Sequence, residues 1–591
     1  MADRTGYTAT TLSDVAFDDV QLSLAGINLM LNNGFREAES IFLKYKNYSP
    51  LMSGGYSFVC FLNAIMSFEE DKMEFAMVAL KETEKMCTVK KAEKSLRVKI
   101  FGNNSNTKKT LLPITLEDRL QRLVIYADCQ LYMSMIIFSR FEISGFMKGG
   151  WLIRKAFKLY ERIYNEIAAV YKDRFGQDIT HPNQTKLPES ETVPVDDDAN
   201  SNDGTENLEN LDFSDITEES LGRLKGAVSF GFGLLQLCIS MMPPNVLKLV
   251  NMFGFHGDKE FGLTCLEEAS RSTDMKAPLA MLSLLWYHTV VRPFFGIDGS
   301  NTEHCIREAK EILEVNEVKY SQSALVMFYR GRVQKLECNL EESLKTYNEA
   351  YDLAVEQREI QLICLYEIGW CSIIKLNWEE GLLAFARLKE DSRWSKCYYA
   401  YLTGVCQGAL GQLETAQEMF KEVPKLSKRK NNQLEAFVIR KSNKFKKKLP
   451  TKPAAILMVI EIVYLWRALP SCSQETLDTM IETLDNATLT LEEQALCRML
   501  KGALHQQMGS KEAAMQNYED AMAYAVQGCE DPYVAPYCSF ELGMLLTEKP
   551  STASRGKALI LRAKENYKDF DFENRLNVRV HAALQQLEGI D

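Results

Sequence analysis

Proline is scarce in this chain. Only 16 prolines occur among 591 residues, beside 32 glycines, and such a low count suits a mostly helical protein because proline breaks a helix interior. The hydrophobic share of 46% and the mean hydropathy of −0.20 are those of a soluble folded protein. At this length the chain exceeds one compact core, so we expect several domains or one extended array.

Long apolar runs are missing too. The two most apolar segments, residues 227–242 and 455–469, fall short of the roughly 20 apolar residues that span a bilayer. The first stops at a pair of prolines and the second contains Glu461, so we expect two buried helices. The first 14 residues lack the apolar core of a secretory signal. The sequence thus predicts a cytoplasmic protein without signal peptide or transmembrane helix.

An excess of basic charge is also absent. The formal net charge is −11 and the isoelectric point is near 5.4, which argues against a dedicated nucleic-acid binder because phosphate contacts need a dominant basic surface. The 15 cysteines are odd in number and include no C-x-x-C pair. We expect them to be reduced core thiols, without disulfides or a metal site.

Catalytic motifs do not occur either. The six histidines are scattered singly, and there is no H-E-x-x-H, no G-x-S-x-G and no Walker loop. Gly231 and Gly233 stand in an apolar, helix-like run with no preceding strand, so close helix packing explains them better than a phosphate loop. His288, among apolar neighbours, is interpreted as a core residue. The sequence predicts that the protein is not an enzyme and has no cofactor or metal.

The chain does contain a repeat between residues 321 and 424. A small residue is followed twelve positions later by a second small residue, and four positions after that by an aromatic. The spacing from unit to unit is close to the roughly 34 residues of a tetratricopeptide helix–turn–helix unit. Two antiparallel helices approach closely only where both lack bulk, and the aromatic fills the wedge beside the crossing. The triads are Gly331, Ser343 and Tyr347; Gly369, Gly381 and Phe385; Gly404, Ala416 and Phe420.

The same spacing returns near both ends of the chain, as Gly26, Ala38 and Phe42, approximately as Ala64, Ala76 and Leu80, and as Gly502, Ala514 and Tyr518. The fold class predicted is therefore all-α, with tetratricopeptide-like helical-hairpin repeats that form a superhelical solenoid, either continuous or in two lobes. The expected regions are a disordered tail (1–17), an N-terminal repeat region (18–186), an acidic disordered loop (187–222), an apolar helical region (223–320), the tandem repeats (321–424), a basic stretch (425–450) and a C-terminal repeat region with capping helices (451–591).

Two of these regions are defined by charge. Residues 187–222 hold twelve Asp or Glu and no Lys or Arg, a composition that cannot offset the entropy cost of ordering; an acidic docking tail or a phosphorylated switch at Ser201 or Ser214 is the functional alternative. Residues 425–448 hold ten Lys or Arg against one acid, Glu435. We interpret them as a solvated helix face or linker, with contact to an acidic membrane, nuclear import or docking of the acidic loop as alternatives. The candidate basic patch comprises Lys428, Arg429, Lys430, Lys446, Lys447 and Lys448.

A candidate protein-binding groove follows from the repeats. The first helix of each tetratricopeptide unit lines the concave face, mainly at its second, fifth, sixth and ninth positions. When the small residue that begins each triad is taken as position eight of that helix, these positions in the present sequence are largely aromatic and apolar. The candidate residues are Phe328, Tyr329, Arg332, Tyr366, Trp370, Tyr398 and Tyr401.

An exposed apolar groove is a liability for a free monomer. We therefore expect it to be filled, either by an amphipathic helix or extended peptide of a partner protein or by another helix of this chain. Related arrays hold the acidic C-termini of chaperones in a clamp of Lys, Asn and Arg. Only Arg332 could imitate that clamp, so we expect none.

Several strings outside the repeats resemble the tetratricopeptide repeat protein 39 family. They are residues 149–155, 223–231, 242–245, 286–295 and 573–576, and the resemblance covers nearly the whole chain except the N-terminal tail and the acidic loop. It implies an all-helical, non-enzymatic cytosolic protein, with no catalytic residues to transfer. Roles suggested across the family are ciliary assembly, lipid handling and clearance of protein inclusions.

The leading functional hypothesis is a helical-repeat adaptor or scaffold for protein–protein interactions, with Tyr329, Tyr366, Trp370 and Tyr401 as anchors and cilium assembly implied by resemblance alone. The alternative is a peripheral membrane or lipid-associated protein that uses the basic stretch and a nearby apolar helix. Binding to acidic liposomes at low salt separates the two.

Overall fold

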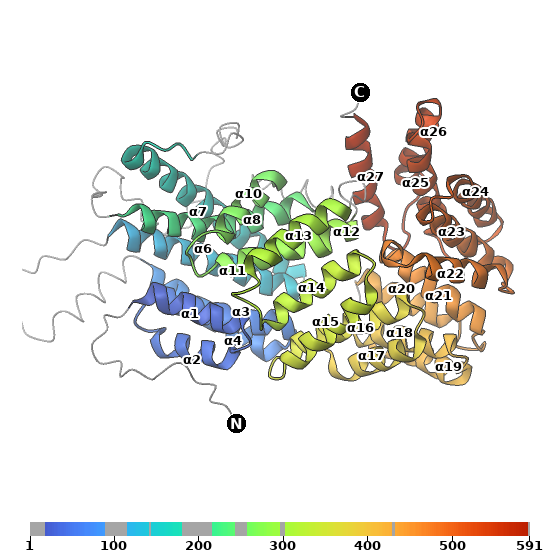
Figure 1. The fold of residues 1–591 in the computed structure, drawn as a ribbon, viewed down its shortest axis with the longest axis horizontal. Coiled ribbons are helices and arrows are strands. Elements are labelled where there is room, and N and C mark those ends of the chain that lie inside the picture. The colour runs from blue at the N-terminus through green and yellow to red at the C-terminus, as the bar shows by residue number, and fades with distance from the viewer. Residues whose placement is uncertain are drawn as a thin grey trace, which may run out of the picture.

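The computed structural model describes residues 18–88, 115–140, 143–179, 216–242, 257–295, 302–427 and 432–588. Within these ranges the chain is helical throughout, with short turns and no strand (Figure 1). The predicted tail (1–17), most of the acidic loop, Lys428, Arg429 and Lys430 lie outside the described residues. The end of the predicted loop, from Glu218 on, is already helical.

The first part of the chain folds as consecutive antiparallel helices. Side chains cap several of them by accepting a hydrogen bond from an otherwise unpaired N–H of the first turn, as Asp18, Ser49, Thr115 and Thr217 do. The helices are α1 (Asp19–Leu31), α2 (Phe35–Tyr45), α3 (Pro50–Ser67), α4 (Glu70–Cys87), α6 (Leu116–Ser139), α7 (Ile143–Phe175), α8 (Glu218–Ser240), α10 (Lys259–Ser270), α11 (Ala277–Trp286), the π-helix η3 (Tyr287–Val291), α12 (Arg292–Phe295) and α13 (Thr302–Asn316).

The three predicted tandem repeats are three helical hairpins. Their helices are α14 (Ala324–Leu336) with α15 (Leu340–Leu353), α16 (Arg358–Ile374) with α17 (Trp378–Asp391), and α18 (Lys396–Ala409) with α19 (Leu413–Glu422). Ser323, Asn339, Asn377 and Ser395 cap the starts of α14, α15, α17 and α18. Each hairpin packs on the next, so the all-helical repeat fold is confirmed.

The rest of the chain continues the helical packing. It comprises the 3₁₀ turn η4 (Val423–Leu426), α20 (Gln433–Asn443), α21 (Lys452–Leu465), the 3₁₀ turn η5 (Leu469–Ser471), α22 (Gln474–Asp485), α23 (Leu491–Gln507), α24 (Lys511–Gln527), α25 (Val534–Thr547), α26 (Pro550–Glu565) and α27 (Glu573–Glu588). Pro550 is the first residue of α26. Proline suits that position because the first turn needs no donor from it.

Each predicted glycine–aromatic pair is a direct contact. A Cβ atom added at Gly331 would lie 2.7 Å from the Tyr347 ring, closer than carbon atoms can pack. A Cβ added at each of the other four glycines would lie equally close to its aromatic ring: Gly26 to Phe42 (2.6 Å), Gly369 to Phe385 (2.8 Å), Gly404 to Phe420 (2.9 Å) and Gly502 to Tyr518 (2.8 Å). All five aromatic side chains are completely buried. The sequence spacing therefore marks an aromatic ring that packs between the two helices of each hairpin.

The hairpin turns depend on one residue with a left-handed backbone. Gly411 (φ 83°) and Gly509 (φ 78°) adopt this conformation without strain. Cys338 and Leu376, both with φ 61°, adopt it at the corresponding turns despite their side chains. A non-glycine residue there costs on the order of 1 kcal/mol, so packing on either side of the turn holds the geometry.

The N-terminal hairpin also touches the middle of the chain. Asn28 accepts a hydrogen bond from the Tyr320 hydroxyl (2.8 Å), and Asn33 accepts one from the backbone N–H of Ala324 (3.1 Å). Figure 1 shows α1 to α4 beside α14 and α15 in agreement with these bonds. The repeats therefore coil until the first hairpin meets the start of the tandem repeats.

The two most apolar segments are buried helices, as predicted. In α8, Gly233 lies so close to α10 that an added Cβ would be 2.8 Å from the Gly262 carbonyl oxygen, which confirms close packing and leaves no room for a phosphate loop. The other segment is α21, whose residues from Ala454 to Leu465 are almost all buried. Among the described residues, no helix is long and apolar enough to cross a membrane.

Candidate functional site

The predicted groove residues lie on α14, α16 and α18, and other parts of the chain cover them. Trp466, directly after α21, stacks on Tyr398 (ring centroids 5.6 Å apart) and on Trp370 (5.8 Å). Tyr366 lies edge-on to Trp370 at 6.2 Å. Trp370 is only 2% exposed and Tyr398 is completely buried. The chain itself therefore fills this part of the groove.

The remaining aromatic candidates are covered in the same way. Tyr401 on α18 is completely buried and faces Phe437 of α20 at 6.3 Å. Phe328 and Tyr329 on α14 are buried, and Phe328 packs 5.8 Å from Tyr347. Of the two occupants that the sequence left open, the structure contains the intramolecular one. That a partner contacts these residues stays a prediction, and it would require the chain's own cover to move.

Arg332 serves to join α14 to its neighbours. Its guanidinium pairs with Glu367 of α16 and donates to the Thr289 carbonyl oxygen (2.9 Å). Thr289 lies in the π-helix η3, four residues before Pro293, whose nitrogen carries no hydrogen that could bond this carbonyl. Burial alone would raise the pKa of Glu367, but Arg332 and Lys335 hold it below its ordinary value. Arg332 is thus occupied by partners within the fold.

The basic stretch divides into two parts. Lys446, Lys447 and Lys448 are exposed in the turn after α20, which agrees with a solvated face. Arg440 and Lys441 belong to α20 and point inward, so that interpretation does not extend to them. Lys441 is only 1% exposed, and its ammonium lies 2.7 Å from Glu461 and 3.1 Å from Asp531.

This buried ion cluster joins three distant segments. Arg440 also pairs with Asp531 (2.9 Å), and Tyr533 donates to Glu461. Burial opposes ionisation of Asp531, but Lys441, Lys444 and Arg440 hold its pKa well below the usual range. Burial instead raises the pKa of Glu461 above its ordinary value. Buried charges persist only when paired in this manner, so the basic stretch fixes α20 against α21 and the turn before α25.

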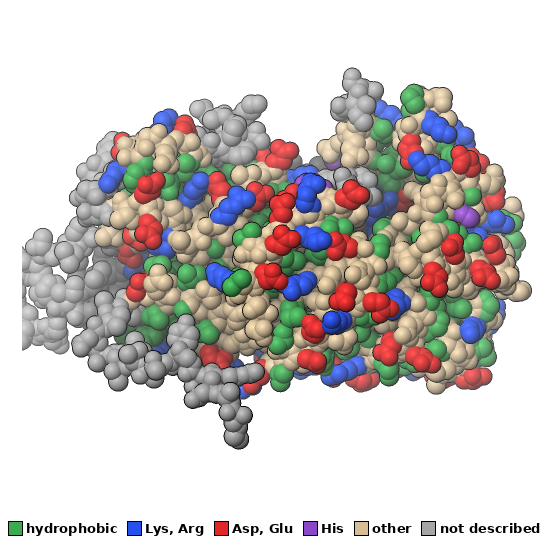
Figure 2. Space-filling model, viewed as in Figure 1, with side chains coloured by type: hydrophobic (Ala, Val, Ile, Leu, Met, Phe, Trp, Pro, Cys, Tyr) green, Lys and Arg blue, Asp and Glu red, His purple; other side chains and the backbone are tan. Residues whose placement is uncertain are grey.

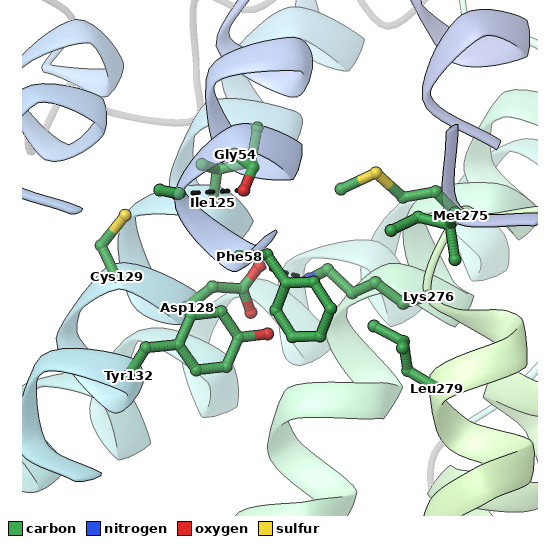
Figure 3. A pocket seen from close by; sticks show the side chains of 11 residues that line it. Gly54, Phe58, Ile125, Asp128, Cys129, Tyr132, Met275, Lys276 and Leu279 are labelled. Atoms are coloured by element: carbon green, nitrogen blue, oxygen red, sulfur yellow. Dashed lines mark hydrogen bonds and ion pairs between the residues drawn. The ribbon is translucent and has the colours of Figure 1, made fainter. Parts of the chain in front are cut away.

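No broad single-sign surface stands out on the face in Figure 2, where acidic and basic side chains are interspersed. The enclosed cavity in Figure 3 has a volume of about 20 Å³ and is lined mainly by apolar groups, including Phe58, Tyr132 and Leu279. Asp128 and Lys276 form an ion pair at its wall. This volume holds about one water molecule, so the cavity cannot accept a substrate.

Two buried thiols of the tandem repeats are held in their protonated form. Burial raises the pKa of Cys406 and of Cys364 to about 12, which disfavours the reactive thiolate. Among the described residues, no group of His, Cys, Asp or Glu is arranged to hold a metal ion. His288 is buried, as the sequence predicted for a core residue.

Sequence reasoning missed Trp466, which covers the groove, and the partners of Lys441. It also missed two residues that pack on Trp466: Phe572, with ring centroids 5.9 Å apart, and Arg575, whose guanidinium lies 4.8 Å from the Trp466 ring. Arg575 lay inside one of the strings that resemble the family, but nothing local tied it to the repeats. Glu461 offered a usable signal, because a carboxylate within an apolar helix requires a buried cation.

Comparison with known proteins places the chain in a family. The crystal structure of yeast Tom70 is 11% identical, with coverage of 97% of this chain and 96% of that one at a TM-score of 0.26. The Cut9 and Hcn1 hetero-tetramer of the APC/C gives 10% identity, 96% coverage of both chains and a TM-score of 0.22. The family model described as Iml2/Tetratricopeptide repeat protein 39 matches residues 24–508, most of the sequence. The chain therefore belongs to the Iml2/tetratricopeptide repeat protein 39 family.

Proposed function

We propose that the chain is a non-enzymatic adaptor that binds other proteins through the outer face of α7. The observation that supports this is an exposed apolar pair: Met147 is 76% exposed and Trp151 61%. Four residues apart on one helix, the two side chains share a face. Large exposed apolar groups are often interaction sites, and tryptophan is enriched where binding energy concentrates.

The surroundings of this pair favour an amphipathic helix with acidic flanks as the ligand. The Lys155 ammonium lies 5.4 Å from the centre of the Trp151 ring, and Lys148 and Lys158 are exposed on the same half of α7. An apolar stripe would cover Met147 and Trp151, while acidic residues beside it would meet these lysines. Nucleic acid is not the expected ligand, since the net charge of the chain is −11.

The aromatic groove on α14, α16 and α18 is a second, conditional surface of the same adaptor. A partner would have to displace Trp466 before it reached Trp370 or Tyr398. Arg332 would have to leave Glu367 before it held a chaperone C-terminus. These costs favour first contact on α7, and we expect the protein to act in the cytoplasm.

The cellular process rests on resemblance alone. The strings that carry the family likeness are most similar to the C member of the tetratricopeptide repeat protein 39 group, which favours a role in cilium assembly. Residues 149–155, which include Trp151, are one of these strings.

Affinity purification from cells tests the adaptor. The intact chain is compared with a Met147→Ser, Trp151→Ser double variant and with Leu383→Ser, a control on α17 of similar exposure (66%). All three should have the same helix content and melting temperature. We expect only the double variant to lose a defined set of partners. An unchanged partner set in that variant would remove the support for this face.

A peripheral membrane role is the second candidate, supported by the exposed lysines at 446 to 448. Flotation with vesicles that contain acidic lipid, at low and at high salt, tests it. Binding at low salt that disappears when the three lysines are replaced by glutamate supports the membrane role. No binding at low salt would exclude it.

A further inference from the structure

Two strings that carry the family resemblance, residues 286–295 and 573–576, are far apart in sequence and meet in the structure. Arg575 of α27 lies with its guanidinium carbon 4.7 Å from the centre of the Phe294 ring of α12. Trp466 and Phe572 enclose the same guanidinium at 4.8 Å and 4.3 Å. Figure 1 shows α27 rising beside α12. Three elements thus form an aromatic cage around one cation.

Two other buried arginines of this region have an acidic partner: Arg332 pairs with Glu367, and Arg579 lies 2.8 Å from Glu541. No carboxylate pairs with Arg575 among the residues that the structure describes. Burial lowers the pKa of Arg575 below its ordinary value, as expected for a cation without a compensating acid.

One hydrogen-bond donor in the cage is also left over. Arg575 Nη1 is buried and, within the described part of the chain, has no hydrogen-bond partner. A buried donor without a partner is destabilising. The region therefore offers a positive charge and an unused N–H group.

The Arg575 side chain as a whole is only partly buried, although aromatic rings cover its guanidinium and Nη1 is buried. A guanidinium in this position can keep its faces on aromatic rings while its edge donates two parallel bonds to an oxyanion. Ring contacts alone explain how α27 is held against α12, but they leave the charge of Arg575 and its Nη1 donor unmatched.

We propose that Arg575 and its cage of Phe294, Trp466 and Phe572 bind an oxyanion, the carboxylate or phosphate group of a ligand. The guanidinium edge, which includes the unpaired Nη1, holds the two oxygens after a small rearrangement of the cage admits them. An acidic side chain of a partner protein is one source, and a free phosphate compound is the other. This site does not depend on the α7 surface, so either can fail alone.

Titration of the full chain with small anions tests the site. Inorganic phosphate and, separately, N-acetylglutamate are added at constant ionic strength, and binding is followed by calorimetry and by the melting temperature. The variants are Arg575→Met, which keeps the apolar stem, and Arg575→Lys, which keeps the charge. The matched control is Arg555→Met on the exposed face of α26, where Arg555 pairs with Glu519 at the surface.

We expect saturable binding of at least one anion to the intact chain and to Arg555→Met. Binding to Arg575→Met should be at least about tenfold weaker, since a hydrogen bond to a charged group contributes roughly 1.5–3 kcal/mol. The anion that binds identifies the source, phosphate or carboxylate. No saturable binding of either anion, or equal binding by Arg575→Met, would overturn the proposal. If Arg575→Met does not fold, Arg575→Lys decides: weaker binding supports the bidentate site and unchanged affinity refutes it.

Discussion

Replacement of Trp370 by alanine separates a packed core from a binding surface. The side chain is 2% exposed and stacks on Trp466 at 5.8 Å, with Tyr366 edge-on at 6.2 Å. Truncation of a buried tryptophan costs about 3–5 kcal/mol, whereas typical domains are stable by only about 5–15 kcal/mol. The variant should therefore lose a large part of the stability of the segment that contains α16, α18 and α21.

The assay is urea unfolding followed by circular dichroism, together with native-state hydrogen exchange. Exchange is needed because repeat arrays unfold in parts, so a single free energy can hide a local loss. We expect amide protection to fall first in α16, α18 and α21. The control Leu383→Ala, on the 66% exposed side chain of α17, should stay within about 0.5 kcal/mol of the parent. A Trp370→Ala protein with normal stability that loses specific partners would refute the packed-core reasoning.

Three further predictions follow from the packing and the charges. Gly369→Ala should lower the free energy of unfolding in urea by about 1–3 kcal/mol, because the new Cβ would lie 2.8 Å from the Phe385 ring. In the control Gly150→Ala the new Cβ has no atom within 4 Å, so the free energy of unfolding should stay the same or rise by up to about 1 kcal/mol. Asp531→Asn should lower the free energy of unfolding by about 3–5 kcal/mol at pH 7, because it leaves buried cations of the ion cluster without their acidic partner. Because the pKa of Asp531 is lowered in the folded state, its carboxylate stabilises the fold above the unfolded-state pKa of about 4, and this contribution is lost as the pH falls. The melting temperature of the variant should therefore decline less on acidification than that of the parent. Equal slopes of melting temperature against pH would contradict this. Triple replacement of Lys446–Lys448 by glutamate should leave the melting temperature unchanged, since these side chains are exposed.

The repeat fold was readable from sequence because its cause is local. Gly331 and Tyr347 are sixteen residues apart, within one hairpin, and their contact is imposed by helix geometry and a short turn. The same reasoning located the wedge at Gly502 and Tyr518, so the hairpin order could be predicted at both ends.

The cover over the groove could not be predicted by the same means. Trp466 reaches Trp370 and Tyr398 only because α21 packs across α18. Hydrophobic periodicity indicates that a helix is buried, but it does not indicate which other helices it packs against. The partners of Lys441 illustrate the same limit, since Asp531 lies ninety residues away. A cluster of lysines and arginines looks identical in sequence whether its charges face water or a buried acid.

The bonds from the first hairpin to the start of the tandem repeats set an order on folding during synthesis. Asn28 and Asn33 meet their partners at Tyr320 and Ala324, so about half of the chain must leave the ribosome before the first two helices are fully enclosed. Simple solenoids can add repeats one at a time from the N-terminus. Here part of the surface of the first two helices stays exposed until residues 320–324 have been synthesised. A long-range closure of this kind raises cooperativity and slows folding, and apolar surface that is exposed until closure favours aggregation of the incomplete chain.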